Sequence, residues 1–269
     1  MTISVSVDLD DLWCSVPGTW RRMSLLEEAI EEAVLLFDRH RIRATFFCIA
    51  RDRRILARGI PLLEQHGHEI ANHSFMHRYN QTLSRARKKR DLVVTHHVLS
   101  ELSQEPPCGY RAPGWGFDAE IDELLFDMGY RYDASLVVSP LYLLLRVPHF
   151  WKQKKRTYIY GSIAENLGHT PRARLPLIKG HSVRALPFYG SFHLYAPAGR
   201  RIFQLQRRRA LRKRPLTYTF HASDFIVDRR ERYSIFQRPD HGEALAEILR
   251  FLSHNGTCTL AESLEGHQM

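Results

Sequence analysis

Short apolar runs alternate with longer segments of helical periodicity along most of this chain, and this alternation limits the folds that it can adopt. The predicted strands cover residues 2–7, 44–50, 68–71, 108–111, 130–133, 183–186, 216–220 and 257–260. The predicted helices cover residues 25–39, 54–66, 83–102, 119–128, 202–212 and 243–252. Strands that alternate with helices form parallel sheets, because each helix crosses back over the sheet before the next strand begins. The number of units favours an α/β fold whose sheet curls into a barrel.

The length and composition of the chain are those of one large globular domain. Of its 269 residues, 44% are hydrophobic and 25% are charged, which is ordinary for a globular protein. The pattern loosens only in an individual insert around residues 137–172, which is rich in proline and basic residues. No run approaches the roughly 20 apolar residues that span a bilayer. We therefore predict a single domain over residues 1–269.

The amino terminus and the cysteines favour a cytoplasmic location. The chain enters a strand pattern at once, without the basic segment and apolar core of a secretory signal. Its four cysteines are dispersed and lack C-x-x-C spacing, so we expect reduced thiols: Cys14, Cys48, Cys108 and Cys258.

The chain is basic, with 39 Lys and Arg against 29 Asp and Glu and a net charge of +10. The basic residues cluster at 85–90, 152–156 and 207–214. Such clusters suit nucleic acid, anionic lipid or a phosphorylated substrate, or they are solvated helix faces. No nucleic-acid-binding motif accompanies them, so no nucleic-acid partner is expected. The apolar run 136–145 is either buried core or a peripheral contact with an anionic membrane at its inner face.

Polar side chains follow several of the predicted strands at the point where each strand ends. Asp8, His73, Arg111, Asp133 and His221 all lie at or just past such an end. In parallel βα folds the ligand site lies at the carboxyl ends of the strands. We therefore expect these five side chains to share one site.

Two of these segments carry the residue types that bind a divalent cation. Asp8, Asp10 and Asp11 follow the first strand, and His73 and His77 form a His-x-x-x-His. Two imidazoles and a carboxylate hold a cation and leave a position open for water, and a further carboxylate can take the proton of that water. Neither segment is diagnostic alone, because aspartates also cap turns and this histidine spacing arises by chance.

Five separated motifs, in this order, resemble the polysaccharide deacetylase family, also known as the NodB homology domain and carbohydrate esterase family 4. They are Ser-Val-Asp-Leu-Asp-Asp at 6–11, His-Ser-Phe-Met-His at 73–77, Tyr-Arg-Ala-Pro-Gly-Trp at 110–115, Tyr-Asp-Ala-Ser at 132–135 and Leu-Thr-Tyr-Thr-Phe-His-Ala-Ser at 216–223. The resemblance covers nearly the whole chain and implies a distorted (β/α)7-type barrel.

The resemblance also implies a metal site and a base. Asp10, His73 and His77 would be the metal ligands, with Asp11 as an alternative to Asp10. Asp8 would be the catalytic base. Zn²⁺ is the expected ion, although this ligand set also suits Co²⁺, Mn²⁺ or Fe²⁺.

The later motifs imply the remaining roles. Arg111 would pair with the base, and an adjacent guanidinium favours its ionised form. His221 would be the general acid that protonates the departing amine, with Asp133 orienting it and raising its pKa. Substrate contacts are expected at residues 113–115, where backbone N–H groups after Pro113 and Gly114 would help to stabilise an oxyanion. Trp115 either stacks on a sugar ring or packs in the turn.

These roles together imply metal-dependent amide hydrolysis that removes an N-acetyl or N-formyl group from an amino sugar or glycoconjugate. The Asp-x-Asp form of the first motif resembles the branch that includes deformylases of lipid-linked amino sugars and related cytoplasmic deacetylases. The basic surface would suit a phosphorylated, nucleotide-linked or lipid-linked sugar. Ser223 and Asp224 depart from that branch, which often has Glu after His-Ala. Two alternatives are a cyclic-amide hydrolase of the allantoinase or imidase type and a non-catalytic carbohydrate- or lipid-binding module.

Overall fold

The computed structural model describes residues 2–10, 22–136, 174–176, 194, 199–210, 216–226 and 240–265. Within these residues, seven parallel strands form one sheet in the order β5-β4-β3-β2-β1-β6, and β7 pairs with β1 beside this path. The strands are β1 (Ile3–Asp8), β2 (Thr45–Cys48), β3 (Glu69–Asn72), β4 (Gly109–Tyr110), β5 (Tyr132–Asp133), β6 (Thr217–His221) and β7 (Thr257–Cys258).

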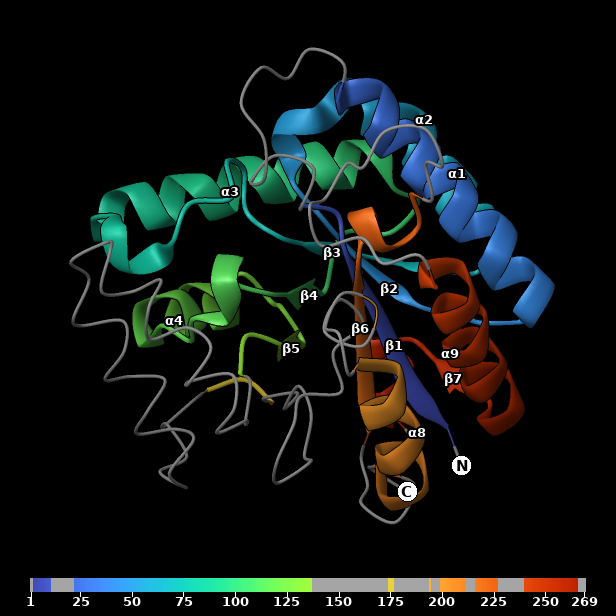
Figure 1. The fold of residues 1–269 in the computed structure, drawn as a ribbon. Coiled ribbons are helices and arrows are strands. Elements are labelled where there is room, and N and C mark those ends of the chain that lie inside the picture. The colour runs from blue at the N-terminus through green and yellow to red at the C-terminus, as the bar shows by residue number, and fades with distance from the viewer. Residues whose placement is uncertain are drawn as a thin grey trace.

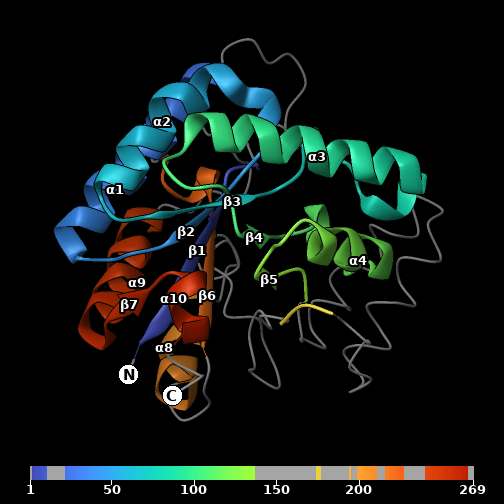
Figure 2. The same ribbon diagram turned by 180° about the vertical axis from the view of Figure 1, so that it is seen from behind.

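Helices cover the outside of this curled sheet (Figures 1 and 2). They are α1 (Arg22–His40), α2 (Arg53–Gln65), α3 (Arg85–Leu102), α4 (Ala119–Asp127), α8 (Gly199–Ala210), α9 (His241–Asn255) and α10 (Leu260–Glu265). The neighbours α4, α3, α2, α1 and α9 contact one another in this order, which follows the order of the strands. The α/β fold with a distorted (β/α) barrel is therefore confirmed. No helix among the described residues is long and apolar enough to cross a bilayer.

The central strand β1 shows why the sequence folds in this way. Its residues Ile-Ser-Val-Ser-Val-Asp alternate between apolar and polar side chains, yet all six are buried. Ile3, Val5 and Val7 belong to the core between sheet and helices, which also holds Phe37 of α1. The polar residues point to the other face, where Ser4 contacts Thr217 at 2.9 Å. Alternation along a strand therefore separates a hydrophobic layer from a polar interior.

Most element boundaries agree with the sequence patterns, and two segments at the edges differ. Tyr130 was expected to begin a strand, but β5 begins at Tyr132. The last strand was expected to reach Leu260, but β7 ends at Cys258, and Leu260 begins α10. Leu260 N–H donates to Thr45 Oγ1 at 2.8 Å, so this chain end turns inward instead of extending the sheet. The predicted strand 183–186 and the insert 137–172 lie outside the described residues.

Candidate active site

Parallel register brings the predicted polar side chains to one edge of the sheet. Asp8, the last residue of β1, is the Cα partner of His221 on β6. On the other side, Cys48 pairs with Asn72, which precedes His73. Asn72 pairs with Tyr110, which precedes Arg111. Because the strands are parallel and end at the same level, the residues that follow them meet in one place, as predicted from their positions in the sequence.

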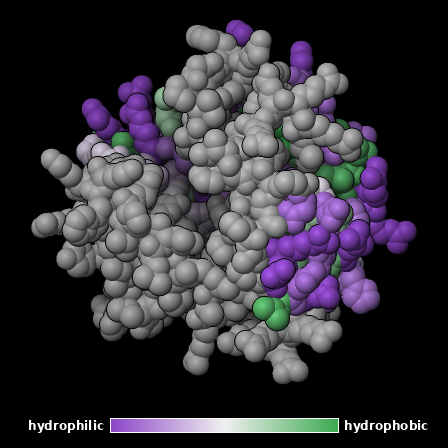
Figure 3. Space-filling view, in the orientation of Figure 1, coloured by the Kyte–Doolittle hydropathy of each residue, from purple (hydrophilic) through white to green (hydrophobic). Residues whose placement is uncertain are grey.

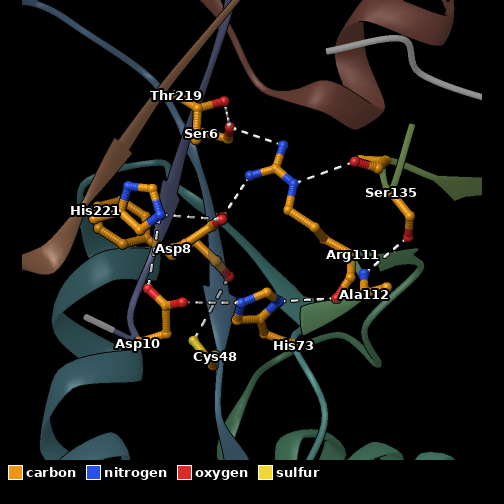
Figure 4. A network of polar contacts seen from close by, with 12 residues as sticks. Ser6, Asp8, Asp10, Cys48, His73, Arg111, Ala112, Ser135, Thr219 and His221 are labelled. Atoms are coloured by element: carbon orange, nitrogen blue, oxygen red, sulfur yellow. Dashed lines mark hydrogen bonds and ion pairs between the residues drawn. The ribbon is translucent and has the colours of Figure 1, made fainter. Parts of the chain in front are cut away.

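Asp10, His73 and His77 form a group that can hold a metal ion. One ligand atom from each lies within 4.8 Å of the other two. His77 Nε2 lies 2.8 Å from Asp10 Oδ2. His73 Nε2 lies 3.6 Å from the same oxygen (Figure 4). Asp10 Oδ1 and His73 Nε2 are buried, yet neither forms a hydrogen bond with the described part of the chain. Buried polar atoms without hydrogen bonds are costly, so this donor set fits a divalent cation. Asp11 lies outside the described residues.

The charge state of Asp10 and the orientation of His73 also suit a cation. Burial by itself raises the pKa of Asp10, but the charge of His221 and the nearby rings of His73 and His77 outweigh it. The net pKa lies well below the usual range, so the carboxylate is ionised. His73 Nδ1 lies 2.8 Å from the carbonyl oxygen of Arg111. Because Nδ1–H donates to this carbonyl, Nε2 is the atom that faces Asp10 with a lone pair.

The loop that carries the two histidines has a strained backbone. Ser74 has φ 72° and His77 has φ 51°, in the left-handed region that non-glycine residues rarely adopt. Such residues cost on the order of 1–3 kcal/mol each and persist only where the surroundings hold them. Here Ser74 N–H donates to Asn72 Oδ1, and His77 N–H donates to Ser74 Oγ, both at 2.9 Å. Phe75 N–H donates to Asp91 Oδ1 of α3 at 2.9 Å, which holds the loop from outside.

Asp8 forms a buried ion pair with Arg111. Arg111 Nη1 donates to Asp8 Oδ1, and Nη2 donates to Ser6 Oγ at 3.0 Å (Figure 4). The guanidinium lies 4.0 Å from the ring centres of both Phe47 and Trp115. Both charged side chains are buried, so each needs the other to offset its loss of water. This arrangement places a fixed carboxylate beside the metal-binding group, as the sequence predicted.

His221 lies beside the two aspartates of β1 and its following turn. Its Nε2 is 3.9 Å from Asp8 Oδ2 and 3.9 Å from Asp10 Oδ1. Its backbone N–H donates to Asp224 Oδ2 at 2.8 Å, which fixes the end of β6. A general acid at this position would lie beside both the Asp8 carboxylate and Asp10 of the metal-binding group.

Asp133 is not the partner of His221, and this prediction requires correction. Asp133 Oδ1 accepts hydrogen bonds from the N–H of Ser135, at 2.8 Å, and from its hydroxyl. Oδ2 has no hydrogen bond within the described residues. β5 and β6 are not neighbours in the sheet, and Ser135, two residues further along the chain, takes up Asp133 Oδ1 instead. Burial raises the pKa of Asp133 to about 7, against the hydrogen bonds of Ser135.

The segment Pro113–Trp115 forms one turn of helix at the end of β4. Trp115 is 5% exposed and its ring covers Arg111, so the structure favours the packing alternative over stacking on a sugar. Its N–H donates to the carbonyl oxygen of Ala112 at 2.9 Å, so this group is not available to an oxyanion. Pro113 is buried, and Gly114 has φ 66°, which permits the tight turn. These residues position Arg111 and its surroundings.

Several residues of the site were not predicted. Ser6 binds the guanidinium of Arg111, and Ser135 Oγ accepts from the N–H of Ala112 at 2.8 Å. Asn72 supports the histidine loop. Ser6 had a signal in the sequence, since it is a polar residue in an apolar strand at the spacing of Asp8. Asn72 had a weaker one, because it directly precedes the first histidine.

Sequence comparisons with known proteins find similarity over about half of the chain. Residues 4–132 match the family model described as polysaccharide deacetylase. The chain is also similar to the peptidoglycan deacetylase of Helicobacter pylori (strain ATCC 700392 / 26695), with 26% identity over 130 residues. That match covers 47% of this chain and 44% of the relative, so it spans less than half of that protein.

Two solved structures share the fold at low sequence identity. A candidate polysaccharide deacetylase from Mycobacterium smegmatis has a TM-score of 0.64 and 16% identity, and the match covers 99% of this chain and 89% of that one. The Xyl-CE4 domain of a multidomain xylanase from the hindgut metagenome of Trinervitermes trinervoides has a TM-score of 0.52 and 13% identity, with coverages of 100% and 91%. At these identities the likeness concerns the fold alone. The matched segment, residues 4–132, is similar to the polysaccharide deacetylase family and carries Asp8, Asp10, His73, His77 and Arg111.

Proposed function

We propose that this chain is a metal-dependent deacylase that hydrolyses the amide of an N-acetyl or N-formyl amino sugar within a glycoconjugate. One observation carries the proposal: the ligand atoms of Asp10, His73 and His77 converge within 4.8 Å, next to the ion pair of Asp8 and Arg111. A divalent cation bound to these three residues, with Zn²⁺ as the expected ion, would polarise the amide carbonyl and make a water molecule more acidic.

The remaining residues divide the proton transfers between them. Asp8 takes the proton from the attacking water, and Arg111 holds the Asp8 carboxylate in place through Nη1. His221 gives a proton to the departing amine. Its Nε2 lies 3.9 Å from the carboxylates of both Asp8 and Asp10, beside the proposed metal site. In the same proposal, Asp133 acts on Arg111 and its neighbours through Ser135, and it does not contact His221.

An anionic substrate, phosphorylated or linked to a nucleotide or lipid, is supported by the basic surface. Arg87, Lys89 and Arg90 are exposed on α3, which follows the histidine loop. On α8, Arg201 is exposed and Leu205 is 73% exposed, a combination that suits the surface of an anionic membrane. Figure 3 shows hydrophilic side chains gathered over α8 and α9. A cytoplasmic location at the inner face of the membrane stays a prediction.

The test is a mass-spectrometric screen of N-acetyl and N-formyl amino sugars in free, nucleotide-linked, lipid-linked and polymeric form. We expect the loss of an acetyl or formyl mass from one class, and no loss after treatment with a chelator. Hydrolysis that persists in the His73→Ala variant would contradict the proposed site. Binding of the glycoconjugates without any hydrolysis, at saturating metal, would favour the non-catalytic module.

A further inference from the structure

A chain of buried hydrogen bonds connects the histidine loop to a tyrosine outside every motif of the site. Tyr130 lies between α4 and β5 and is 4% exposed. Its hydroxyl oxygen accepts a hydrogen bond from Asn72 Nδ2 at 2.9 Å. Asn72 Oδ1 accepts the N–H of Ser74, and Ser74 Oγ accepts the N–H of His77, again at 2.9 Å each. Three successive contacts thus lead from Tyr130 to the second histidine of the metal-binding group.

The amide of Asn72 has to point one way for this chain to work. Its oxygen must face the Ser74 N–H, because a rotated amide would place its own N–H₂ against that donor. With the oxygen in this position, Nδ2 is buried and needs an acceptor, and the Tyr130 hydroxyl supplies it. The phenol can in turn donate its proton to His96 Nδ1 of α3, which lies 3.2 Å away. Tyr130 therefore selects the orientation of Asn72.

The orientation of Asn72 matters because the loop is strained. Ser74 and His77 both have positive φ. The hydrogen bond from Ser74 N–H to Asn72 Oδ1 and the one from His77 N–H to Ser74 Oγ hold these conformations. A loop that relaxes toward ordinary φ values moves the His77 ring away from Asp10. The metal-binding geometry of this loop therefore depends on the hydrogen bonds that hold its strained backbone.

We propose that Tyr130 is a positioning residue for the metal site, acting through Asn72 on the loop that carries His73 and His77. This proposal rests on the metal site of the proposed function. It assigns no chemical step to Tyr130, whose hydroxyl faces Asn72. Tyr130 keeps the histidine loop of the metal-free protein close to the geometry that the cation requires.

The experiment compares Tyr130→Phe with Tyr132→Phe, a matched control two residues away. Tyr132 is also fully buried, and its hydroxyl donates one hydrogen bond of 2.7 Å, to Glu69 Oε1 at the start of β3. Both variants lose one buried hydroxyl, but only Tyr130 is linked to the histidine loop. The probe is Co²⁺, titrated into the metal-free full chain and followed by visible absorption, with thermal unfolding of the metal-free proteins measured alongside.

We expect Tyr130→Phe to raise the Co²⁺ Kd about tenfold, the scale found when an outer-shell partner of a metal ligand is removed. Tyr132→Phe should leave the Kd within about twofold of the wild-type value on the same scale, although both variants lower the unfolding temperature. Saturating metal should restore the hydrolysis rate of Tyr130→Phe. Equal Kd values for the two variants would overturn the proposal, whether both bind as tightly as the wild type or both bind more weakly.

Asn72→Ala tests the route of the effect. If Tyr130 acts through Asn72, adding Tyr130→Phe to Asn72→Ala causes no further change in Kd, whereas independent effects would multiply. If Asn72→Ala does not fold, the pair of tyrosine variants still decides the matter.

Failure of the proposed function gives a different result. A wild-type chain that binds Co²⁺ through His73 but hydrolyses no N-acyl amino sugar contradicts the function and leaves the role of Tyr130 intact. A wild-type chain that binds no Co²⁺ overturns both.

Discussion

The two ends of the same strands differ in how fully their carboxylates are hydrogen-bonded. At the amino end of β3, the Glu69 carboxylate accepts from Tyr132 Oη at 2.7 Å, Thr45 Oγ1 at 2.6 Å and the N–H of Ala261 at 3.1 Å. At the carboxyl end, Asp10 Oδ1 and His73 Nε2 are buried and form no hydrogen bond within the described residues. The Glu69 carboxylate is satisfied internally, whereas Asp10 and His73 keep polar atoms that a ligand can satisfy.

Backbone strain is also greater at the carboxyl end. Of the four non-glycine residues with positive φ in the described part of the chain, Ser74, His77 and Trp115 follow the carboxyl ends of strands, and Arg41 lies between α1 and β2. The amino end of β2 and β3 is instead closed by α10, whose first N–H groups donate to Thr45 and Glu69. In parallel βα folds the carboxyl end carries function and the opposite end carries stability. This protein shows that difference within single strands of four residues.

Replacing Asp8, the proposed base, should have the largest effect on activity at the carboxyl end. We expect Asp8→Asn to reduce kcat by about 10²- to 10⁴-fold, because general base catalysis contributes on this scale. The measurement is steady-state hydrolysis with saturating metal, and Glu69→Gln is the control from the opposite end. A wild-type rate for Asp8→Asn would remove Asp8 from the mechanism.

The pH dependence of stability should reveal the raised pKa of Asp133, a further buried carboxyl at this end. The pKa of Asp133 is raised to about 7, above that of the unfolded chain, so the folded state binds the proton more tightly. The stability that Asp133 contributes is therefore fully present below about pH 4 and is lost as the pH rises through about 7, by at most ~4 kcal/mol at 1.36 kcal/mol per unit. Denaturant unfolding from pH 4 to 8 should show this loss relative to Asp133→Asn. Parallel pH profiles for the two proteins would show that Asp133 has an ordinary pKa.

Metal binding should stabilise the folded chain, because it satisfies the buried polar atoms of Asp10 and His73 at the carboxyl end. A cation at a hundredfold excess over its Kd stabilises the folded chain by about 2.7 kcal/mol. Denaturant unfolding with and without chelator measures this difference, and His73→Ala should show none. If chelator leaves the wild-type unfolding free energy unchanged, the orphan atoms of Asp10 and His73 are not satisfied by a metal.

A substitution at the amino end should change the stability of the chain and leave metal binding and activity unchanged. Glu69→Gln replaces an acceptor by a donor facing Thr45 or Tyr132, and we expect a loss of about 1–3 kcal/mol of unfolding free energy. The Co²⁺ Kd and the rate per folded molecule should stay at the wild-type values. A higher Co²⁺ Kd in this variant would show that the two ends are coupled, and it would contradict the division of roles between them.

The positions of the site residues along the chain could be predicted, because they depend on local patterns. The run of β1 ends at Asp8, and the His-x-x-x-His follows β3, so a parallel sheet places both at one edge. The pairing of Arg111 with Asp8 came from the family resemblance and is present in the structure. The pairing of Asp133 with His221 came from the same source and is absent, since Asp133 binds Ser135.

Sequence alone determined which segments form strands and helices and which residues stand at the strand ends, since burial leaves a periodic pattern in neighbouring residues. Only the tertiary structure decided which side chains touch. The stacking of Trp115 on Arg111, the contact of Tyr130 with Asn72 and the turn of Leu260 toward Thr45 join residues 4, 58 and 215 positions apart. Such contacts depend on sheet register and side-chain rotamers, which are set by packing across the molecule and leave no local signature in the chain.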